Sequence, residues 1–536
     1  MTKARTLGWL VMALLLGAGC AASAASTRPT LREHYQAPGT AEAHYRSAPP
    51  PGAALTGPHA FRVGQGIEAA PAAEALRPDP RLGQLAAWVL EERGPEGETP
   101  PHPVIDLWAR HLGMPEPAPH LIVLAQSDPE TLAQRIEDEL SRVLSSQRYT
   151  HYGAATGDLE GVVVTVLALS WRWADFEPLP RRLTPGAPLT IAGKLHADLR
   201  DAMLVVSYPD GTSTRAPKQK GRDFKADVPT EQRGEYRVEI LAEGKLGTTV
   251  VANFPIYVGV EPARSVTVER AADHGERLPP SEVGERLLAL INRDRERAGL
   301  SPVEAHSPLD AVAAAHSKDM HDHGFVGHTS PTTGGAGDRV KRADIRTPYV
   351  LENIGRGYSP EEVHRGLMDS PGHRANVMTP DATHVGIGVV VEIEDERPAY
   401  LVTELFGRFA EPIDVDDAVD DLVELLDAER KKRGLPELAM NDTLTELAGA
   451  TAERFFAEPG SDQNALLQAL SKRAAQAGGG YSRQTAMMTV VPALEDVLGI
   501  EALLDPAVRG VGLGVAQGTR EDTIELGIAI VVVIGY

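Results

Sequence analysis

The sequence predicts a multi-domain α+β protein. Its 536 residues correspond to roughly three or four domains of ordinary size. Helical spacing and strand alternation occupy different stretches, with short alternating strands concentrated between residues 178 and 260. One pattern of residues, at 287–300, returns in diverged form 135 residues later. Together these features indicate several modules joined in series, one of them repeated.

The N-terminus has the pattern of an export signal. An apolar run at 7–16 follows two basic residues and is too short to span a membrane. Cys20, the only cysteine in the sequence, resembles the lipidated cysteine of a bacterial lipobox, although Gly17 stands where that pattern prefers Leu. We therefore predict a lipoprotein-type signal peptide at 1–20 and lipidation of Cys20. The alternative is ordinary signal cleavage near Ala25.

The charge balance and the single cysteine bear on partners and stability. The sequence has 53 basic and 75 acidic side chains, a formal net charge of −22. Nucleic-acid binding needs clustered Lys and Arg, so we predict no nucleic-acid partner. One cysteine allows no internal disulfide, so the domains must be stabilised by their cores. We expect an exported protein, anchored to a membrane by its lipid or located in the periplasm or outside the cell.

Three regions precede the part of the chain that carries the motifs. Residues 21–78 are rich in Ala, Pro, Ser and Thr without sustained periodicity, and are predicted to form a disordered tether. Residues 79–175 mix helical spacing with two apolar strand-like runs, which indicates an α+β module. Residues 178–262 contain many short alternating segments separated by turn signals, which predicts an immunoglobulin-like β-sandwich.

Three separated motifs carry the chemistry: His328-Thr329-Ser330-Pro331, Glu352-Asn353-Ile354, and Ser370-Pro371-Gly372-His373-Arg374-Ala375-Asn376. Two histidines and a carboxylate from distant positions are what a shared pocket needs, to hold a metal or to move protons. Another histidine, His316, is predicted to lie on a helix over 309–320, and we interpret it as structural.

These motifs, in this order and spacing, resemble the CAP superfamily (cysteine-rich secretory proteins, antigen 5 and pathogenesis-related proteins), in its bacterial secreted branch. The resemblance covers 281–412. It also rests on segments outside the three motifs: Leu287 to Asn292 with Arg295 and Gly299-Leu300, Ala315 to Met320, Val385 to Val389, and Leu405 to Gly407. The family resemblance implies an α-β-α sandwich with an open cleft on one side.

The resemblance also implies the site residues. His328 and His373 correspond to the two cleft histidines, and Glu352 to the carboxylate between them. Neutral imidazoles suit a divalent metal such as zinc, so His328 and His373 are the candidate metal ligands, with Glu352 as a base or an orienting partner. Many family members carry a second cleft Glu, but Ser370 stands near that place here. Glu404 could replace that Glu if its side chain faces the cleft.

The repeat predicts that 416–536 is a degenerate copy of the same domain. Leu422 to Asp427, Arg430 and Gly434-Leu435 repeat the helix pattern, and Val511-Gly512-Leu513-Gly514-Val515 repeats Val385-Gly386-Ile387-Gly388-Val389. The copy has no counterpart of the three motifs. The segment Thr150 to Ala155 faintly resembles Thr383 to Gly388, so 79–175 is either another degenerate CAP-like copy or an unrelated α+β domain.

The favoured function is binding of a small ligand, lipid, glycan or peptide in the His/Glu cleft, with or without a metal. The catalytic residues are unknown, and an enzyme is the less favoured interpretation. One alternative is a metal-dependent hydrolase acting on peptide or cell-wall substrate. Another is a structural or adhesion protein at the cell surface, since a shared fold supports several activities.

Overall fold

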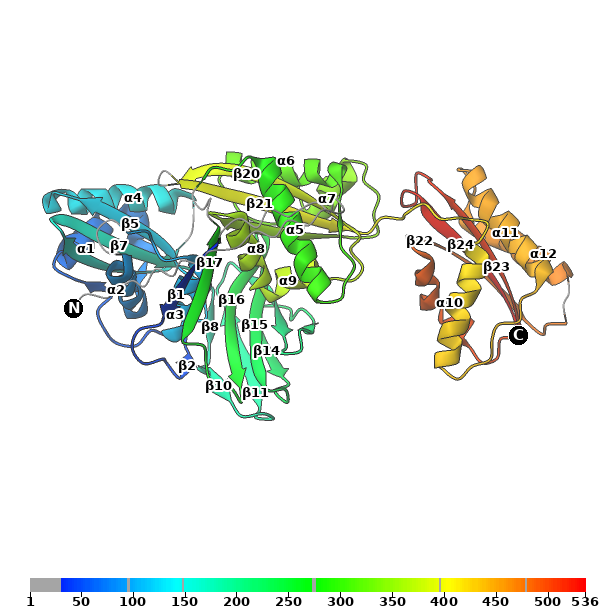
Figure 1. Ribbon diagram of the computed structural model, residues 1–536, viewed down its shortest axis with the longest axis horizontal. Helices are drawn as coiled ribbons and strands as arrows, with labels where there is room; N and C mark the ends of the chain where they lie inside the picture. Colours follow the sequence, from blue (N-terminus) through cyan, green and yellow to red (C-terminus); the bar gives the residue numbers. More distant parts are fainter. Residues whose placement is uncertain (1–29, 94–96, 147–148, 272–275, 395–396, 478–479) are drawn as a thin grey trace, which may run out of the picture.

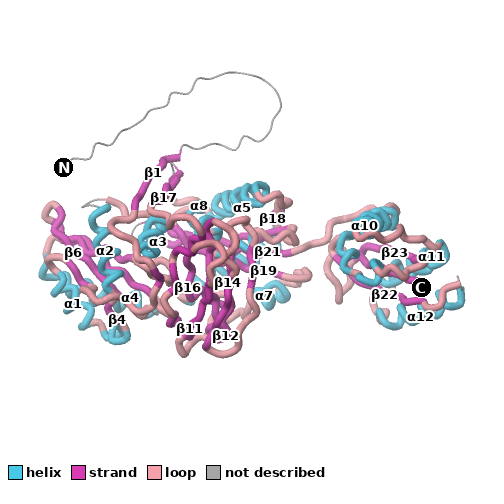
Figure 2. The backbone as a smooth tube through the Cα atoms, turned by 90° about the horizontal axis from the view of Figure 1, so that it is seen from below, coloured by secondary structure: helices cyan, strands magenta, loops and turns pink. Residues whose placement is uncertain are grey.

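The computed structural model describes residues 30–93, 97–146, 149–271, 276–394, 397–477 and 480–536. Figure 1 shows four parts along the chain, with the C-terminal domain set apart from the other three, and Figure 2 shows the same separation from below. The predicted signal peptide and Cys20 lie outside the described residues. Among the described residues, no helix is long and apolar enough to cross a membrane.

The N-terminal domain is built on a sheet in which β3, β6, β7 and β5 are neighbours and β4 also pairs with β6. Its helices cover both faces, α1 and α4 on one side and α2 and α3 on the other. Its elements are β1 (Thr30–Gln36), β2 (His44–Tyr45), β3 (Leu55–Thr56), α1 (Ala60–Ala69), η1 (Pro71–Ala75), β4 (Arg77–Pro78), α2 (Pro80–Arg93), α3 (His102–His111), β5 (His120–Gln126), η2 (Pro129–Thr131), α4 (Leu132–Ser146), β6 (His151–Leu159) and β7 (Val162–Ser170).

The predicted tether is wrong for residues 30–78, which contain two helical segments and four strands. Strand β1 pairs antiparallel with β17 along its whole length, and Val63 and Ile67 of α1 are buried against α4. Small side chains misled the sequence interpretation, because Ala70 and Ala73 are core residues here. A low density of large apolar side chains therefore did not prevent burial in this segment.

The second part, the sandwich domain, consists of a five-stranded and a three-stranded sheet around one core. The larger sheet has the order β10-β16-β15-β12-β13 and the smaller β14-β11-β8. Its elements are β8 (Ala174–Phe176), β9 (Leu179–Pro180), β10 (Arg182–Leu183), β11 (Leu189–Leu195), β12 (Arg200–Ser207), β13 (Ser213–Arg215), β14 (Asp223–Val228), β15 (Gly234–Gly244), β16 (Gly247–Val258) and β17 (Ser265–Ala271). The long β15–β16 hairpin reaches the third domain.

The third domain has a four-stranded sheet, order β18-β20-β21-β19, between two helical layers. Alternate residues of β21 face α5 and α8 on one side, and α6 and α7 on the other. Its elements are α5 (Pro280–Arg297), β18 (Glu304–Ala305), α6 (Ser307–His323), α7 (Ala336–Arg342), β19 (Val350–Gly357), α8 (Pro360–Met368), α9 (Pro371–Val377), β20 (His384–Glu394) and β21 (Arg397–Gly407). The motif residues lie at one end of β19, between α6, α7 and α9.

The C-terminal domain has a three-stranded antiparallel sheet, order β22-β24-β23, with helices packed on it. Its elements are α10 (Ala418–Lys432), α11 (Asp442–Ala457), α12 (Gln463–Ala477), β22 (Gln484–Val491), η3 (Leu494–Gly499), η4 (Glu501–Leu504), β23 (Gly510–Gly518) and β24 (Gly527–Gly535). It contacts the third domain through a few side chains, such as Arg408, whose guanidinium lies 2.9 Å from Asp496.

Two buried arginines make the same contacts in the third and C-terminal domains. Nε of Arg295 donates to the carbonyl of Ser301 at 2.8 Å, and Nε of Arg430 donates to the carbonyl of Pro436 at 2.7 Å. Both guanidinium groups also reach carbonyls far along the chain, of Val377 at 2.7 Å and of Leu503 at 2.6 Å. Each arginine thus ties the end of its helix to the loop before the central strands.

The repeated glycines have a common physical cause. Strand β20 runs so close to α6 that a Cβ on Gly388 would lie 2.0 Å from the nitrogen of Ala314. A Cβ on Gly514 of β23 would lie 2.2 Å from the carbonyl carbon of Ala448 on α11. The repeated Val-Gly-Xaa-Gly-Val segments therefore mark the place where a helix lies directly on a strand.

Candidate functional site

The loop that carries His328 is fixed to α6 by side-chain hydrogen bonds. The hydroxyl of Ser330 accepts from the backbone N–H groups of Thr332 at 3.0 Å and Thr333 at 2.9 Å, and donates to the carboxylate of Asp319 on α6. Short polar side chains stabilise turns in this way. Ser330 is therefore a structural residue of the turn, and the turn directs His328 toward the end of β19.

Glu352, on β19, links His328 to a buried cation. Its Oε1 lies 2.9 Å from Nδ1 of His328, and its Oε2 accepts from the guanidinium of Arg339 on α7. The side chains of Glu352 and Arg339 are each 4% exposed. A carboxylate can only accept, so Nδ1 of His328 carries the hydrogen. In the neutral ring, Nε2 is then left with its lone pair, as in a carboxylate–histidine pair that orients a ligand or a base.

His316, on α6, lies beside Glu352 and has a structural role, as the sequence analysis predicted. Its side chain is fully buried, and Nε2 lies 3.1 Å from the carbonyl oxygen of Gly327 and 4.0 Å from Oε2 of Glu352. Burial lowers the pKa of His316, and the nearby carboxylate of Glu352 only partly opposes this. A neutral His316 donating to Gly327 holds the backbone next to His328.

His373 comes from α9 and lies opposite His328. The ring centroids of the two histidines are 6.4 Å apart, with an angle of 37° between the ring planes. Loss of hydration on burial, and to a smaller extent the neighbouring His328, lower the pKa of His373 to about 3. His373 is therefore a neutral imidazole at ordinary pH.

The other two predicted cleft residues point elsewhere. Ser370 caps α9, and its hydroxyl donates to Glu239 of the sandwich domain at 2.6 Å. Glu404 pairs across the sheet with Asn353, whereas Glu352 pairs with Leu405, so Glu404 and Glu352 lie on opposite faces. Glu404 is fully buried and accepts a hydrogen bond from Asn353 at 3.0 Å. Burial raises the pKa of Glu404 to about 7.

The structure thus brings together His328, Glu352 and His373, and separates Ser370 and Glu404 from them. Sequence reasoning missed Arg339, which neutralises Glu352, and Glu239, which contacts α9 from another domain. Nothing in the sequence around Arg339 distinguishes it from arginines that are expected to be exposed. Both residues act across distances in the chain that no local motif records.

A zinc site here would have to be built from His328, His373 and Glu352. Zinc prefers tetrahedral nitrogen, sulfur or oxygen ligands at about 2.0–2.3 Å. Both oxygens of Glu352 are already engaged by His328 and Arg339. Within the described residues, no group of three or more His, Cys, Asp or Glu side chains is arranged to hold a metal ion. Of the predicted site residues, His328 and His373 are thus left as the candidate metal ligands, with Glu352 hydrogen-bonded to His328.

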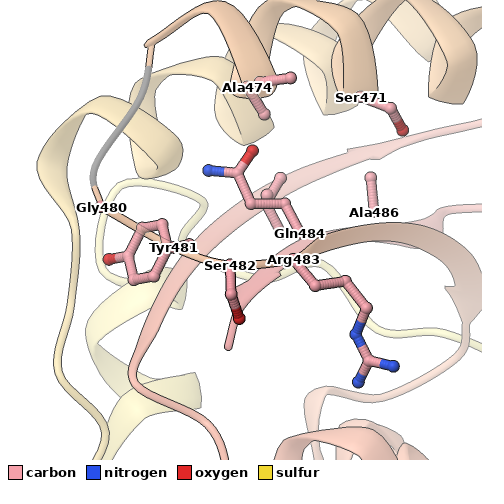
Figure 3. Close-up of a pocket in the computed structure, with 10 residues that line it drawn as sticks. Ser471, Ala474, Gly480, Tyr481, Ser482, Arg483, Gln484 and Ala486 are labelled. Atoms are coloured by element: carbon pink, nitrogen blue, oxygen red, sulfur yellow. The ribbon is translucent and has the colours of Figure 1, made fainter.

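The C-terminal domain has a hollow beside α12 and β22. Its volume is about 270 Å³, and Figure 3 shows side chains from the end of α12 and the start of β22 around it. Ala486, which lines it, pairs with Val533 of β24. None of the residues described as lining it is a His, Asp or Glu. This hollow therefore lacks the titratable groups of the His328 cleft.

The chain is similar to known proteins over part of its length. The model of the cysteine-rich secretory protein family (CAP) matches residues 288–403. An uncharacterized protein of Bacillus subtilis, YkwD, is 38% identical over 115 residues, which are 21% of this chain and 45% of that protein. A second B. subtilis protein, the uncharacterized membrane protein YlbC, is 29% identical over 178 residues, 30% of this chain and 49% of that protein. The chain thus spans about half the length of these curated relatives.

Among solved structures, an extracellular protein containing an SCP domain, from Bacillus anthracis strain Ames, is 22% identical. The match covers 33% of this chain and 65% of that one, with a TM-score of 0.21, which is too low to carry an argument. The family match falls on the domain that holds His328, Glu352 and His373. This chain therefore contains, in its third domain, a member of the CAP family of cysteine-rich secretory proteins.

Proposed function

We propose that the CAP domain binds a ligand in the cleft between His328 and His373. The observation that carries this proposal is the pairing of Nδ1 of His328 with Glu352, which leaves Nε2 as the other ring nitrogen, close to the neutral imidazole of His373. Two such nitrogens can ligate a divalent metal such as zinc. Without a metal, they accept hydrogen bonds from the hydroxyl or amide groups of a lipid headgroup, a glycan or a peptide.

Isothermal titration of the chain with Zn²⁺ tests the metal-dependent form. We expect wild type to bind one ion and the double variant His328→Ala with His373→Ala to lose it. The matched control is His321→Ala with His323→Ala, which removes two histidines from the end of α6. Binding that persists in the cleft variant, or disappears in the control, contradicts the assignment.

If wild type binds no Zn²⁺, the metal-free form is tested with a panel of phospholipid vesicles, soluble glycans and peptides. Retention of any of these should again require His328 and His373. Equal retention by the double variant would exclude the cleft as the binding site.

A second function, hydrolysis of peptide or cell-wall substrate, is favoured by one contact. The 2.9 Å pairing of His328 with Glu352 is the arrangement of a base and its orienting carboxylate. We expect Glu352→Gln to reduce turnover strongly if hydrolysis occurs, because the amide can reverse the tautomer of His328. Absence of turnover on peptide and peptidoglycan substrates, with and without Zn²⁺, would eliminate this function.

We further propose that residues 416–536 are a degenerate copy of the CAP domain. The arginine contacts and the close-packed glycines described above support this, as does the capping of α6 and α11 by His306 and Asn441. The N-terminal domain has a related arrangement, because β4 runs parallel to β6 just before α2, as β18 runs parallel to β20 before α6. For 178–262, two sheets around one core support an immunoglobulin-like origin.

The proposed setting is outside the cytoplasm, with the chain anchored through lipid on Cys20. The signal-like N-terminus supports this, and the similar protein YlbC is described as a membrane protein. Metabolic labelling with a palmitate analogue should label wild type and not Cys20→Ser. Equal labelling of the two, or none in wild type, contradicts the lipid anchor. A surface role in adhesion would be independent of His328 and His373, which the double variant also tests.

A further inference from the structure

One hairpin of the sandwich domain contacts both segments that carry the cleft histidines. The hairpin consists of β15 and β16, joined by a tight turn at Gly244–Gly247. Its turn lies against the loop of His328, and strand β15 lies against α9, which carries His373. These two contacts are independent of each other and involve different residues of the hairpin.

The turn of the hairpin is seated on the backbone of the His328 loop. The N–H of Thr329 donates to the carbonyl of Leu246 at 2.9 Å. A Cβ on Gly327 would lie 2.6 Å from Cβ of Leu246, and a Cβ on Gly247 would lie 3.2 Å from Cβ of His328. Backbone approaches this close leave no room for water between the turn and the loop.

The strand contact is made by a buried carboxylate. Glu239 is fully buried, and its Oε1 accepts from the hydroxyl of Ser370 at 2.6 Å, while its Oε2 accepts from the N–H of Gly372 at 2.7 Å. Next to it, the side-chain amide of Asn253 donates to the carbonyl of Asp369 at 3.2 Å. A buried carboxylate is costly unless its oxygens are hydrogen-bonded, and here both are bonded to the first residues of α9.

The hydrogen bonds of Glu239 hold the backbone next to His373. Gly372 directly precedes His373 in the chain and Ser370 lies three residues before it. Asn353, beside Glu352, donates to the carbonyl of His373 at 3.3 Å. The start of α9 is thus held from the sandwich domain on one side and from β19 on the other. Removing the sandwich contact would free the end of α9 that sets the ring of His373.

We propose that the β15–β16 hairpin is a clamp across the CAP cleft, in which Glu239 is a positioning residue for His373 and the turn at Leu246 holds the loop of His328. The role of this clamp in binding rests on the proposed function, but its existence does not. The sandwich domain then contributes to the site, because the separation of the imidazoles of His328 and His373 depends on its hairpin. A ligand too large for the clamped cleft has to displace the hairpin from one of its two contacts.

Hydrogen exchange of the whole chain, followed by mass spectrometry, tests the clamp without any ligand. In Glu239→Ala, peptides covering 371–377 should exchange about tenfold faster, because two charge-assisted hydrogen bonds are lost. In Glu239→Gln, the carbonyl of the amide still accepts from Gly372, so exchange should stay within about threefold of wild type. The matched control is Glu243→Ala on the same strand, whose carboxylate contacts Lys218 and Thr248 instead, and which should leave 371–377 unchanged.

A core peptide from α5, covering 283–291, separates clamping from general destabilisation. It should exchange at the wild-type rate in Glu239→Ala. Faster exchange of α5 to the same extent, or unchanged exchange of 371–377, would overturn the assignment of Glu239. The variant Gly327→Ala tests the second contact, because its Cβ must push Leu246 away; peptides at 325–330 should exchange faster while 371–377 do not. Unchanged exchange at 325–330 would contradict the role of the turn.

Carbethoxylation of single histidines gives a readout at the cleft itself. We expect His373 to react faster in Glu239→Ala than in wild type, and Glu239→Gln to restore the slow rate. His321 on the surface of α6 is the internal reference and should react equally in all variants. An unchanged rate at His373 would overturn the positioning role. If wild type binds neither Zn²⁺ nor any ligand, the proposed function fails, and these exchange and modification results still decide the clamp.

Discussion

In the CAP domain Glu352 pairs across the sheet with Leu405, and in the C-terminal domain Ala486 pairs with Val533 at the corresponding register. Where α6 places His316 beside Glu352, α11 places Thr451, whose hydroxyl only bonds back to the carbonyl of Leu447 at 2.7 Å. The buried arginine and the close-packed glycines are nevertheless present in both domains. The frame of the fold therefore does not need the charged cluster.

This difference separates stability from function. A buried carboxylate and guanidinium lose their hydration on folding, and an apolar pair is often as stable or more stable. In the C-terminal domain Ala486 and Val533 pair across the sheet and line a hollow of about 270 Å³, with no carboxylate among the residues described as lining it. Residues kept in the CAP domain at that cost, chiefly Glu352, Arg339 and His316, are for this reason the best candidates for a function that folding does not explain.

The largest expected effect concerns the shared arginines. Arg295→Ala and Arg430→Ala should each destabilise their own domain by about 4 kcal/mol, because several buried carbonyls lose their donor. Urea unfolding read by hydrogen exchange of peptides from each domain measures this. If only one of the two substitutions is costly, the two domains do not share the frame that their contacts indicate.

The glycines should give the next largest effect. Gly388→Ala and Gly514→Ala should each cost about 3 kcal/mol, because the new methyl group would overlap the backbone of the adjacent helix. The control is Gly449→Ala on α11, where a Cβ meets nothing within 4 Å and a small stabilisation of about 0.5–1 kcal/mol is expected. The same unfolding measurement applies, and tolerance of alanine at 388 or 514 would refute the close-approach explanation.

Glu404 should make the CAP domain pH-sensitive in a way the C-terminal domain is not. Its pKa in the folded domain is about 7, above the ordinary value of 4.5, so the folded state binds more protons over this interval. Stability from this residue is therefore present below about pH 4.5 and is lost as the pH rises to 7. Val532, at the corresponding register of β24, cannot titrate.

Glu404→Gln should consequently stabilise the CAP domain by about 2 kcal/mol at pH 8 and destabilise it by about 1 kcal/mol at pH 4.5. Each value is the free-energy cost of ionising the buried Glu404 at that pH, less the cost of burying an amide whose N–H groups are not all hydrogen-bonded. Unfolding of wild type and variant across this pH range measures the difference. A difference between them that does not change with pH would contradict the protonation argument.

The smallest effect distinguishes two buried helix positions, His316 on α6 and Thr451 on α11. His316→Leu should cost about 1.5 kcal/mol, since the carbonyl of Gly327 loses a buried donor. Thr451→Val should cost less than about 0.5 kcal/mol, because its hydroxyl bonds only within its own helix. Equal costs at the two positions would mean that His316 has no special role beneath the cleft.

Local sequence patterns predicted a good part of this arrangement. The repeat of Leu287 to Leu300, the Gly-Xaa-Gly strands and the three motifs located the CAP domain and named His328, Glu352 and His373. The predicted tether was wrong for residues 30–78, because the alternation in β1 becomes meaningful only when β17 pairs with it. Glu404 was predicted in the cleft, but register placed it on the opposite face, and a one-residue shift decides that face.

By itself, the sequence located the CAP domain and named His328, Glu352 and His373, because these lie in motifs a few residues long. Only the tertiary structure decided that Arg339 neutralises Glu352, that Glu404 is buried away from the histidines, and that Glu239 of another domain holds α9. The residues in these three contacts are 13, 51 and 133 positions apart in the chain, respectively. Such contacts are set by how sheets and domains pack, which no local pattern encodes.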